Sequence, residues 1–175
     1  MKTDLQETLA STVHSIEMKA QSKDITIRTE YAKDVPQFID TDSRRLQQIL
    51  FNLFGNAIKF SKEGGVIDFC ISVTESQDRS SFDEESEEWS PSEDDDLSSD
   101  TDSHASLPER KLRFVVKDYG KGIRREDFGR IFRPFLQANS ETEKVYGGTG
   151  LGLAITSKLV QRLGGRISVN SVECE

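Results

Sequence analysis

The interpretation of this chain begins with the stretch Asn52-Leu53-Phe54-Gly55-Asn56-Ala57-Ile58-Lys59. With about 100° of rotation per residue, this stretch predicts a helix in which a polar arc lies beside an apolar stripe. Asn52, Asn56 and Lys59 fall within roughly 60° of one another on that arc. We expect the stripe to anchor the helix and the polar arc to face a cleft. The apolar stripe consists of Leu46, Ile49, Leu50, Leu53 and Ala57.

The polar arc suits a magnesium-nucleotide site. An amide oxygen can complete a magnesium shell that already contains phosphate oxygens and waters, and a lysine can meet the charge of a phosphate. The alternative is a solvated helix edge, because Asn and Lys are ordinary surface residues. The helix alone does not decide between the two, but two glycine motifs further along the chain favour the nucleotide site.

The charge of the chain is divided unevenly. Residues 75–109 contain 14 acidic side chains and one basic side chain, Arg79, so this segment carries −13 while the whole chain carries −8. The rest of the chain is therefore at +5, and a mildly basic domain favours an anionic ligand such as ATP. The segment has the composition of a disordered insert, either inert or regulatory through its acid-flanked serines Ser86 and Ser90.

Length, hydrophobic content and cysteines limit the remaining possibilities. A chain of 175 residues with 34% hydrophobic content can form one substantial core, with part of the chain left outside it. No apolar run approaches the length of a membrane span, and the polar N-terminus lacks a signal-peptide pattern. Cys70 and Cys174 form neither a metal-ligand cluster nor a disulfide framework. We therefore expect a cytoplasmic domain, either on its own or as the cytosolic part of a membrane-bound receptor.

Helical and strand patterns mix along the chain without regular alternation, which favours helices packed on one face of a mixed sheet. Asp42 and Ser43 are candidate caps for the asparagine helix, which we expect to end near Phe60. The insert at 75–109 separates two strands, and closing so long a loop costs only about 0.6 kcal/mol per doubling of its length. The predicted helices span 3–21, 43–60 and 151–163, an amphipathic stretch spans 128–135, and the predicted strands span 25–29, 36–39, 66–73, 112–117 and 166–169.

The first glycine motif, Asp118-Tyr119-Gly120-Lys121-Gly122-Ile123, directly follows a predicted strand. Its two glycines allow the backbone to come close to a ligand. The carboxylate at the strand end can accept a hydrogen bond from an exocyclic amine, which distinguishes adenine from guanine. A plain Asp-Gly turn is the alternative.

The second glycine motif, Gly147-Gly148-Thr149-Gly150-Leu151-Gly152-Leu153, closes a polar loop and opens a helix. Backbone N–H groups and the positive end of the helix dipole favour phosphate binding there. A dinucleotide fingerprint needs a strand immediately before its glycines, and a Walker loop needs a following Gly-Lys-Ser/Thr. Neither requirement is met.

Taken in order, these motifs resemble the four sequence boxes of the catalytic and ATP-binding domain (HATPase_c) of sensor histidine kinases, in the GHKL superfamily. The resemblance covers roughly residues 1–74 and 110–172, and Phe135-x-Gln137 with Tyr146 to Gly150 is most similar to the hybrid kinases. The boxes are the N box from Arg45 to Lys59, the first glycine box from Asp118 to Ile123, the F box from Ile131 to Phe135, and the second glycine box from Gly148 to Leu153.

The resemblance implies a Bergerat-type ATP-binding fold, an α/β (α+β) two-layer sandwich of about three helices on a mixed sheet. ATP would lie between the asparagine helix and a mobile lid near residues 136–149. Asn56 would ligate Mg²⁺, Asn52 and Lys59 would act as the catalytic residues at the phosphates or the metal's waters, and Asp118 would bind the adenine amino group. The other nucleotide-binding residues implied are Gly120, Gly122, Ile123, Phe135, Gly148, Thr149, Gly150, Leu151 and Gly152.

The residue at position 52 favours phosphotransfer over hydrolysis. Hydrolytic members of the superfamily place a glutamate one helical turn before the magnesium asparagine, whereas this chain has Asn52, and an amide is a poor general base. Neither His14 nor His104 resembles the acceptor histidine, which an acidic residue normally follows. The expectation is one catalytic domain over residues 1–175, without the dimerisation domain that carries the acceptor.

The resemblance also implies partners. The γ-phosphoryl would pass to a histidine on a dimerisation domain, in cis or in trans, and then to the receiver domain of a response regulator in a two-component phosphorelay. We expect no nucleic-acid partner and no membrane contact by this domain itself. A nucleotide-binding or partner-binding scaffold without catalysis stays as an alternative, with a GHKL ATPase less favoured.

Overall fold

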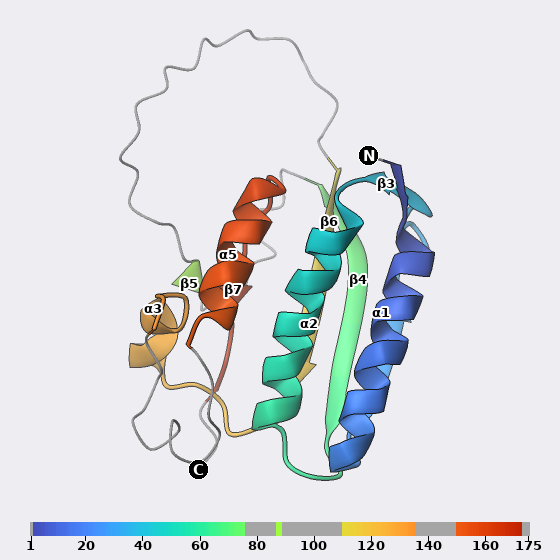
Figure 1. The fold of residues 1–175 in the computed structure, drawn as a ribbon. Helices are drawn as coiled ribbons and strands as arrows, with labels where there is room; N and C mark the ends of the chain where they lie inside the picture. The colour runs from blue at the N-terminus through green and yellow to red at the C-terminus, as the bar shows by residue number, and fades with distance from the viewer. Residues whose placement is uncertain (1, 76–86, 89–109, 136–149, 173–175) are drawn as a thin grey trace, which may run out of the picture.

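The computed structural model describes residues 2–75, 87–88, 110–135 and 150–172 (Figure 1). Helices α1 (Leu5–Ala20), α2 (Ser43–Phe60) and α5 (Gly152–Arg162) lie side by side, with α2 packed between the other two. Behind them is a sheet of strands β2 (Thr26–Tyr31), β4 (Val66–Glu75) and β6 (Arg110–Asp118) in the order β2-β4-β6. β2 is parallel to β4, and β6 is antiparallel to it. The predicted layer of helices on a mixed sheet is confirmed.

The helix α2 begins where the sequence places its cap. The Asp42 side chain accepts hydrogen bonds from the backbone N–H groups of Arg44 and Arg45, at 3.0 and 3.2 Å. These bonds satisfy donors that the first helical turn cannot satisfy internally. The helix ends at Phe60 as predicted, so its full span was predictable from local signals.

The apolar stripe of α2 differs from the predicted one at two positions, because Ile58 is buried as well and Phe54 replaces Leu53. Leu53 is half-buried, and Phe54 is fully buried in its place. Counted from Leu50, Phe54 is rotated by only about 40° and Leu53 by about 60° to the other side. Phe54 also meets a partner in the sheet, because its ring packs edge-on against Phe69 with 5.1 Å between ring centroids.

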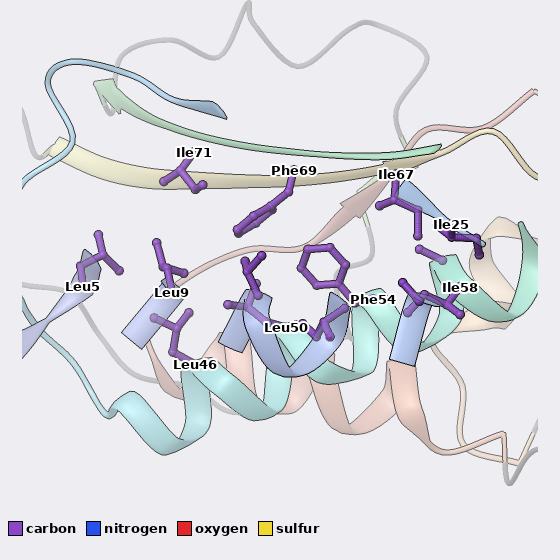
Figure 2. Packing of buried hydrophobic residues seen from close by; sticks show 14 residues of the cluster. Leu5, Leu9, Ile25, Leu46, Leu50, Phe54, Ile58, Ile67, Phe69 and Ile71 are labelled. Atoms are coloured by element: carbon purple, nitrogen blue, oxygen red, sulfur yellow. The ribbon is translucent and has the colours of Figure 1, made fainter. Parts of the chain in front are cut away.

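The core lies between α1, α2 and the sheet (Figure 2). Along β4, Ile67, Phe69 and Ile71 alternate with residues that project to the other side, so all three point at the helices. Leu5 and Leu9 of α1 meet them from one side. This packing fixes the end of α2 relative to the end of β6, which is where the sequence places its site.

The N-terminal residues form a strand that was not predicted. β1 (Lys2–Asp4) pairs antiparallel with β3 (Phe38–Asp40), and α1 begins only at Leu5. Asp4 then caps α1 by accepting a hydrogen bond from the Glu7 backbone at 3.0 Å. The helical spacing of the apolar residues after position 5 gave no sign that the chain before it is extended.

The structure defines two segments of the C-terminal half more closely, the amphipathic stretch 128–135 and the last predicted strand. The segment 128–135 contains only α3 (Phe128–Ile131), preceded by the 3-10 turn η3 (Arg125–Asp127). Pro134 explains the early end, because proline cannot continue a helix and disfavours helical backbone in the residue before it. The last strand, β7, is Ser168–Val169 rather than 166–169.

The acidic segment is partly ordered. Of residues 75–109, Glu75 ends β4 and β5 (Glu87–Glu88) pairs antiparallel with β7, so these residues are strand rather than disordered chain. Residues 76–86 and 89–109 lie outside the described part, and their disorder stays a prediction. Among the helices that the structure describes, none combines the length and apolar character that a membrane span requires.

Candidate nucleotide-binding site

Asp118 ends β6 and projects towards the helices. In the antiparallel ladder it lies opposite Ile67, whose side chain is fully buried in the core, and directly opposed residues share a face of the sheet. Asp68, the next residue along β4, projects to the other face, where its carboxylate accepts a hydrogen bond from the Tyr119 hydroxyl at 2.7 Å. Tyr119 is thereby held on the face opposite to the Asp118 side chain.

The turn after Asp118 is pressed against the end of α2. The Gly120 N–H donates to Asp118 Oδ1 at 2.9 Å. A Cβ atom at Gly120 would lie 2.4 Å from the backbone carbonyl oxygen of Phe60, so only glycine fits. Gly122 has φ +73°, a left-handed conformation that glycine adopts without strain. The two glycines thus bring the carboxylate and the end of α2 together.

Lys23, which follows α1, also contacts the C-terminal end of α2. Its ammonium group donates to the backbone carbonyls of Ile58, Lys59 and Ser61 at 3.0, 3.0 and 3.2 Å. The first two carbonyls belong to the last helical turn, which cannot satisfy them internally, and the third belongs to the residue after the helix. A cation is also favoured there by the helix dipole. The backbone that carries Lys59 and Phe60 is therefore fixed on both sides.

Two lysines gather at the ring of Phe60. Lys59 Nζ lies 4.9 Å from the ring centroid and Lys121 Nζ lies 5.3 Å from it. The pKa of Lys59 is lowered, first by burial and second by the positive charge of Lys121. The end of α2 and the first glycine motif therefore form an electropositive spot beside Asp118.

Asn52 connects α2 with α5. Its amide nitrogen donates to the Gly152 carbonyl at 3.4 Å and to the Thr156 hydroxyl at 3.2 Å. Thr156 is fully buried, and its own hydroxyl donates to the Gly152 carbonyl at 2.9 Å. Asn56, one turn further along α2, is half-exposed. The second glycine motif is thus attached to the asparagine helix through its last glycine.

The F box and the second glycine box meet at one hydrogen bond. The Phe135 N–H donates to the Gly150 carbonyl at 3.2 Å, and both residues have left-handed backbones, with φ of 62° and 66°. A left-handed backbone is uncommon for a phenylalanine, and this side chain is 76% exposed. The hydrogen bond holds the two ends of the segment 136–149 together, and that segment, including Gly148 and Thr149, lies outside the described residues.

Comparison with known proteins identifies the family. Residues 41–174 match the family described as histidine kinase-, DNA gyrase B-, and HSP90-like ATPase (HATPase_c). The chain belongs to this family. It is 34% identical over 95% of its length to hybrid signal transduction histidine kinase A of Dictyostelium discoideum and to the signal transduction histidine-protein kinase BarA of Escherichia coli K12. It is 29% identical over 97% of its length to the peroxide stress-activated histidine kinase mak2 of Schizosaccharomyces pombe.

Solved structures agree with this HATPase_c assignment. Full-length ShkA in complex with AMPPNP is similar over 99% of this chain and 28% of its own, with a TM-score of 0.66 and 28% identity. The catalytic domain of histidine kinase ThkA, at 23% identity over 93% of this chain and 80% of its own, shares the fold with a TM-score of 0.60. The chain spans only 7%, 15% and 6% of the three curated relatives, in the order given above. It is an ATP-binding catalytic domain of the sensor histidine kinase type.

The structure brings some predicted residues of the HATPase_c site together and places others apart. Asp118 and Gly120 meet the end of α2 near Lys59, whereas Asn52 is joined to Gly152 at the start of α5. The Ile123 N–H donates to the Ser171 hydroxyl at 2.9 Å, which ties the first glycine box to the C-terminal segment. Leu151 is the residue before α5.

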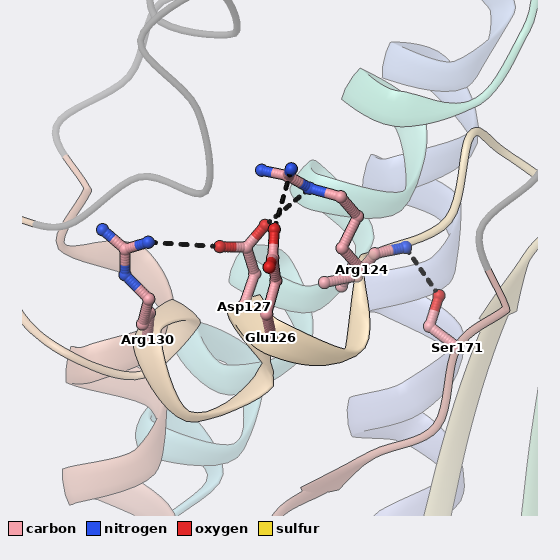
Figure 3. A network of polar contacts seen from close by, with 6 residues as sticks. Arg124, Glu126, Asp127, Arg130 and Ser171 are labelled. Carbon is pink, nitrogen blue, oxygen red and sulfur yellow. Dashed lines mark hydrogen bonds and ion pairs between the residues drawn. The ribbon is translucent and has the colours of Figure 1, made fainter.

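Sequence reasoning missed one buried carboxylate of this HATPase_c domain. Asp127 is 1% exposed and pairs with Arg124 at 3.2 Å and Arg130 at 3.5 Å, while Arg124 also pairs with Glu126 at 2.8 Å (Figure 3). The Arg130 contact is a charge pair rather than a hydrogen bond, because Asp127 Oδ1 has no hydrogen-bond partner. The three-residue spacing of Arg124, Asp127 and Arg130 was the available signal. This network fixes the start of the F-box region.

Proposed function

We propose that this domain binds Mg-ATP and transfers the γ-phosphoryl group to a histidine side chain on a dimerisation domain. The observation that carries the proposal is the junction at Gly120, whose backbone packs against the Phe60 carbonyl at the end of the asparagine helix and whose N–H holds the exposed strand-end carboxylate of Asp118. A carboxylate at this point can accept a hydrogen bond from the adenine amino group. We place the triphosphate along α2, beside its amides and its lysine.

The donor set of α2 fits a magnesium ion bound mainly by the nucleotide. Asn56 offers a half-exposed amide oxygen, a hard ligand of the kind Mg²⁺ accepts when phosphate oxygens and waters complete its shell. Bound there, the metal would neutralise phosphate charge. Lys59 would contact a phosphate by a charge-assisted hydrogen bond, and Asn52 would orient the phosphates from the α5 side.

Phosphoryl transfer depends mainly on how the protein positions the reacting groups, and little on covalent chemistry by the protein itself. An imidazole nitrogen of the acceptor attacks the γ-phosphorus, the bond from that phosphorus to the bridging oxygen breaks, and ADP leaves with the electron pair. Water is not activated one turn before Asn56, because the residue there is Asn52 and its amide already donates to Gly152 and Thr156. An amide in this position favours transfer over hydrolysis.

The rest of the assignment concerns the whole protein. His14 is exposed on α1 and is followed by Ser15, so we place the acceptor histidine on another domain, in cis or in trans. We propose that the phosphoryl group then passes to a receiver domain in a two-component phosphorelay, in the cytoplasm. We treat residues 1–175 as one catalytic domain with an acidic insert at 75–109.

Calorimetry with a non-hydrolysable ATP analogue, with and without magnesium, tests the proposal. The intact chain should bind with magnesium, and Asn56→Ala and Asp118→Asn should each weaken binding at least tenfold. Gln48→Ala, an exposed amide on the same helix, is the matched control and should bind normally. If the folded intact chain binds no nucleotide, the proposal is wrong and a non-catalytic scaffold is favoured.

A further inference from the structure

Lys121 has no role in the proposed function, yet its position is unusual. Its ammonium group lies 5.3 Å from the centroid of the Phe60 ring, which also has Lys59 Nζ at 4.9 Å. The two lysines come from different elements, one from the end of α2 and one from the turn after β6. Two like charges beside one ring repel each other, and the pKa of Lys59 is lowered in part by Lys121. An anion bound between them would relieve that repulsion.

Two glycines flank Lys121, and their close packing and backbone conformation determine where this residue lies. Gly120, immediately before it, packs against the Phe60 carbonyl so closely that a Cβ atom would not fit, and Gly122, immediately after it, has a left-handed backbone. Lys121 is three residues from Asp118, a span of at most about 10 Å. It is therefore close in the chain to the carboxylate proposed for the base, and it shares the Phe60 ring with the lysine proposed for the phosphates.

We propose that Lys121 is a second phosphate-binding cation of the nucleotide site and contacts, together with Lys59, the phosphates nearest the nucleoside. This inference rests on the proposed function and adds a residue to the same site. The phosphates near the nucleoside are present in ADP as well as in ATP. Lys121 thus strengthens binding of both nucleotides and does not select for the γ-phosphate.

Lys121→Met is the variant that tests this role, and Lys117→Met is its matched control. Lys121 and Lys117 are both exposed, so neither substitution opens the core. Lys117 also lies over an aromatic ring, with Nζ 4.9 Å from the Tyr119 centroid. It pairs with Asp68 in the ladder and therefore projects from the other face of the sheet. The two variants remove the same charge on opposite sides of one strand end.

Calorimetry measures the affinity of each variant for ADP and for a non-hydrolysable ATP analogue, and an NMR titration measures the affinity for adenosine. Lys121→Met should weaken ADP and the ATP analogue equally, by about tenfold, as expected for one charge-assisted phosphate contact. Adenosine should bind within twofold of the unmodified chain. Lys117→Met should change none of the three, and Lys121→Arg should restore most of the phosphate-dependent affinity.

Two other results would overturn the inference. Unchanged ADP affinity in Lys121→Met would show that the lysine does not contact phosphate. An equal loss of adenosine and ADP affinity would show that Lys121 only supports the base pocket. If the intact chain binds none of the ligands, the proposed function itself fails, and this outcome is recognised before any variant is compared.

Discussion

Gly120→Ala is the substitution whose effect follows most directly from the structure. The added Cβ would lie 2.4 Å from the Phe60 carbonyl oxygen, whereas ordinary contact begins at 3.4 Å, so the two backbones must separate by about 1 Å. Both are held in place, Phe60 at the end of α2 and Gly120 by its hydrogen bond to Asp118. Overpacking of this kind costs about 1–3 kcal/mol of the free energy of unfolding. For a domain of this size, the melting temperature should fall by about 3–10 °C.

The same displacement should weaken nucleotide binding, because it moves the Asp118 carboxylate away from the asparagine helix. The assay is calorimetry with the ATP analogue at a temperature where both proteins are folded. The matched control is Gly55→Ala in the middle of α2, where the added Cβ would meet, within the described part of the chain, nothing closer than 4 Å apart from its own stretch of helix. That variant should be more stable by about 0.5–1 kcal/mol, because alanine favours the helix. If Gly120→Ala melted and bound like the unmodified chain, the close approach at Phe60 would be refuted.

Three further predictions concern charged groups. Lys23→Met should lower the free energy of unfolding by about 1–3 kcal/mol, measured by urea denaturation, because three carbonyls at the end of α2 lose a cationic donor; unchanged stability would contradict this. Because the lowered pKa of Lys59 enlarges its neutral fraction at pH 9, an acylating reagent followed by mass spectrometry should label Lys59 faster in the unmodified chain than in Lys121→Met. Equal rates in the two proteins would argue against coupling between the lysines. Asp127→Asn should destabilise the domain by about 1–3 kcal/mol through its two arginine contacts, and a melting temperature within 1 °C of the parent would be evidence against that network.

Elements determined by local signals were predictable from the sequence. The span of α2 followed from Asp42 as its cap and from the helical period of its apolar residues. The β4 and β6 strands were found from their alternation, although each extends further than predicted. The exchange of Leu53 for Phe54 was not predictable, because it depends on where Phe69 of β4 stands relative to the helix.

The candidate site residues were named from the sequence and stay a prediction, whereas their geometry could not be predicted. Asp118 and the asparagine helix were connected by a family resemblance, since nothing in their spacing along the chain joins residues so far apart. The contact of Lys23 with the end of α2 spans 35 to 38 residues and has no sequence signature. The meeting of Lys59 and Lys121 at Phe60 likewise arises only from tertiary packing.

The ladder between β4 and β6 has a consequence for how this domain tolerates change. It runs without interruption from the Ile67–Asp118 pair to the Glu75–Arg110 pair, where the acidic segment is attached. Eight residue steps, about 27 Å of strand, separate the segment from the carboxylate of Asp118. The segment can therefore lengthen or shorten in evolution without moving Asp118. A single residue gained or lost within β6 would instead move every following side chain to the opposite face of the sheet, so that Asp118 would point away from the helices.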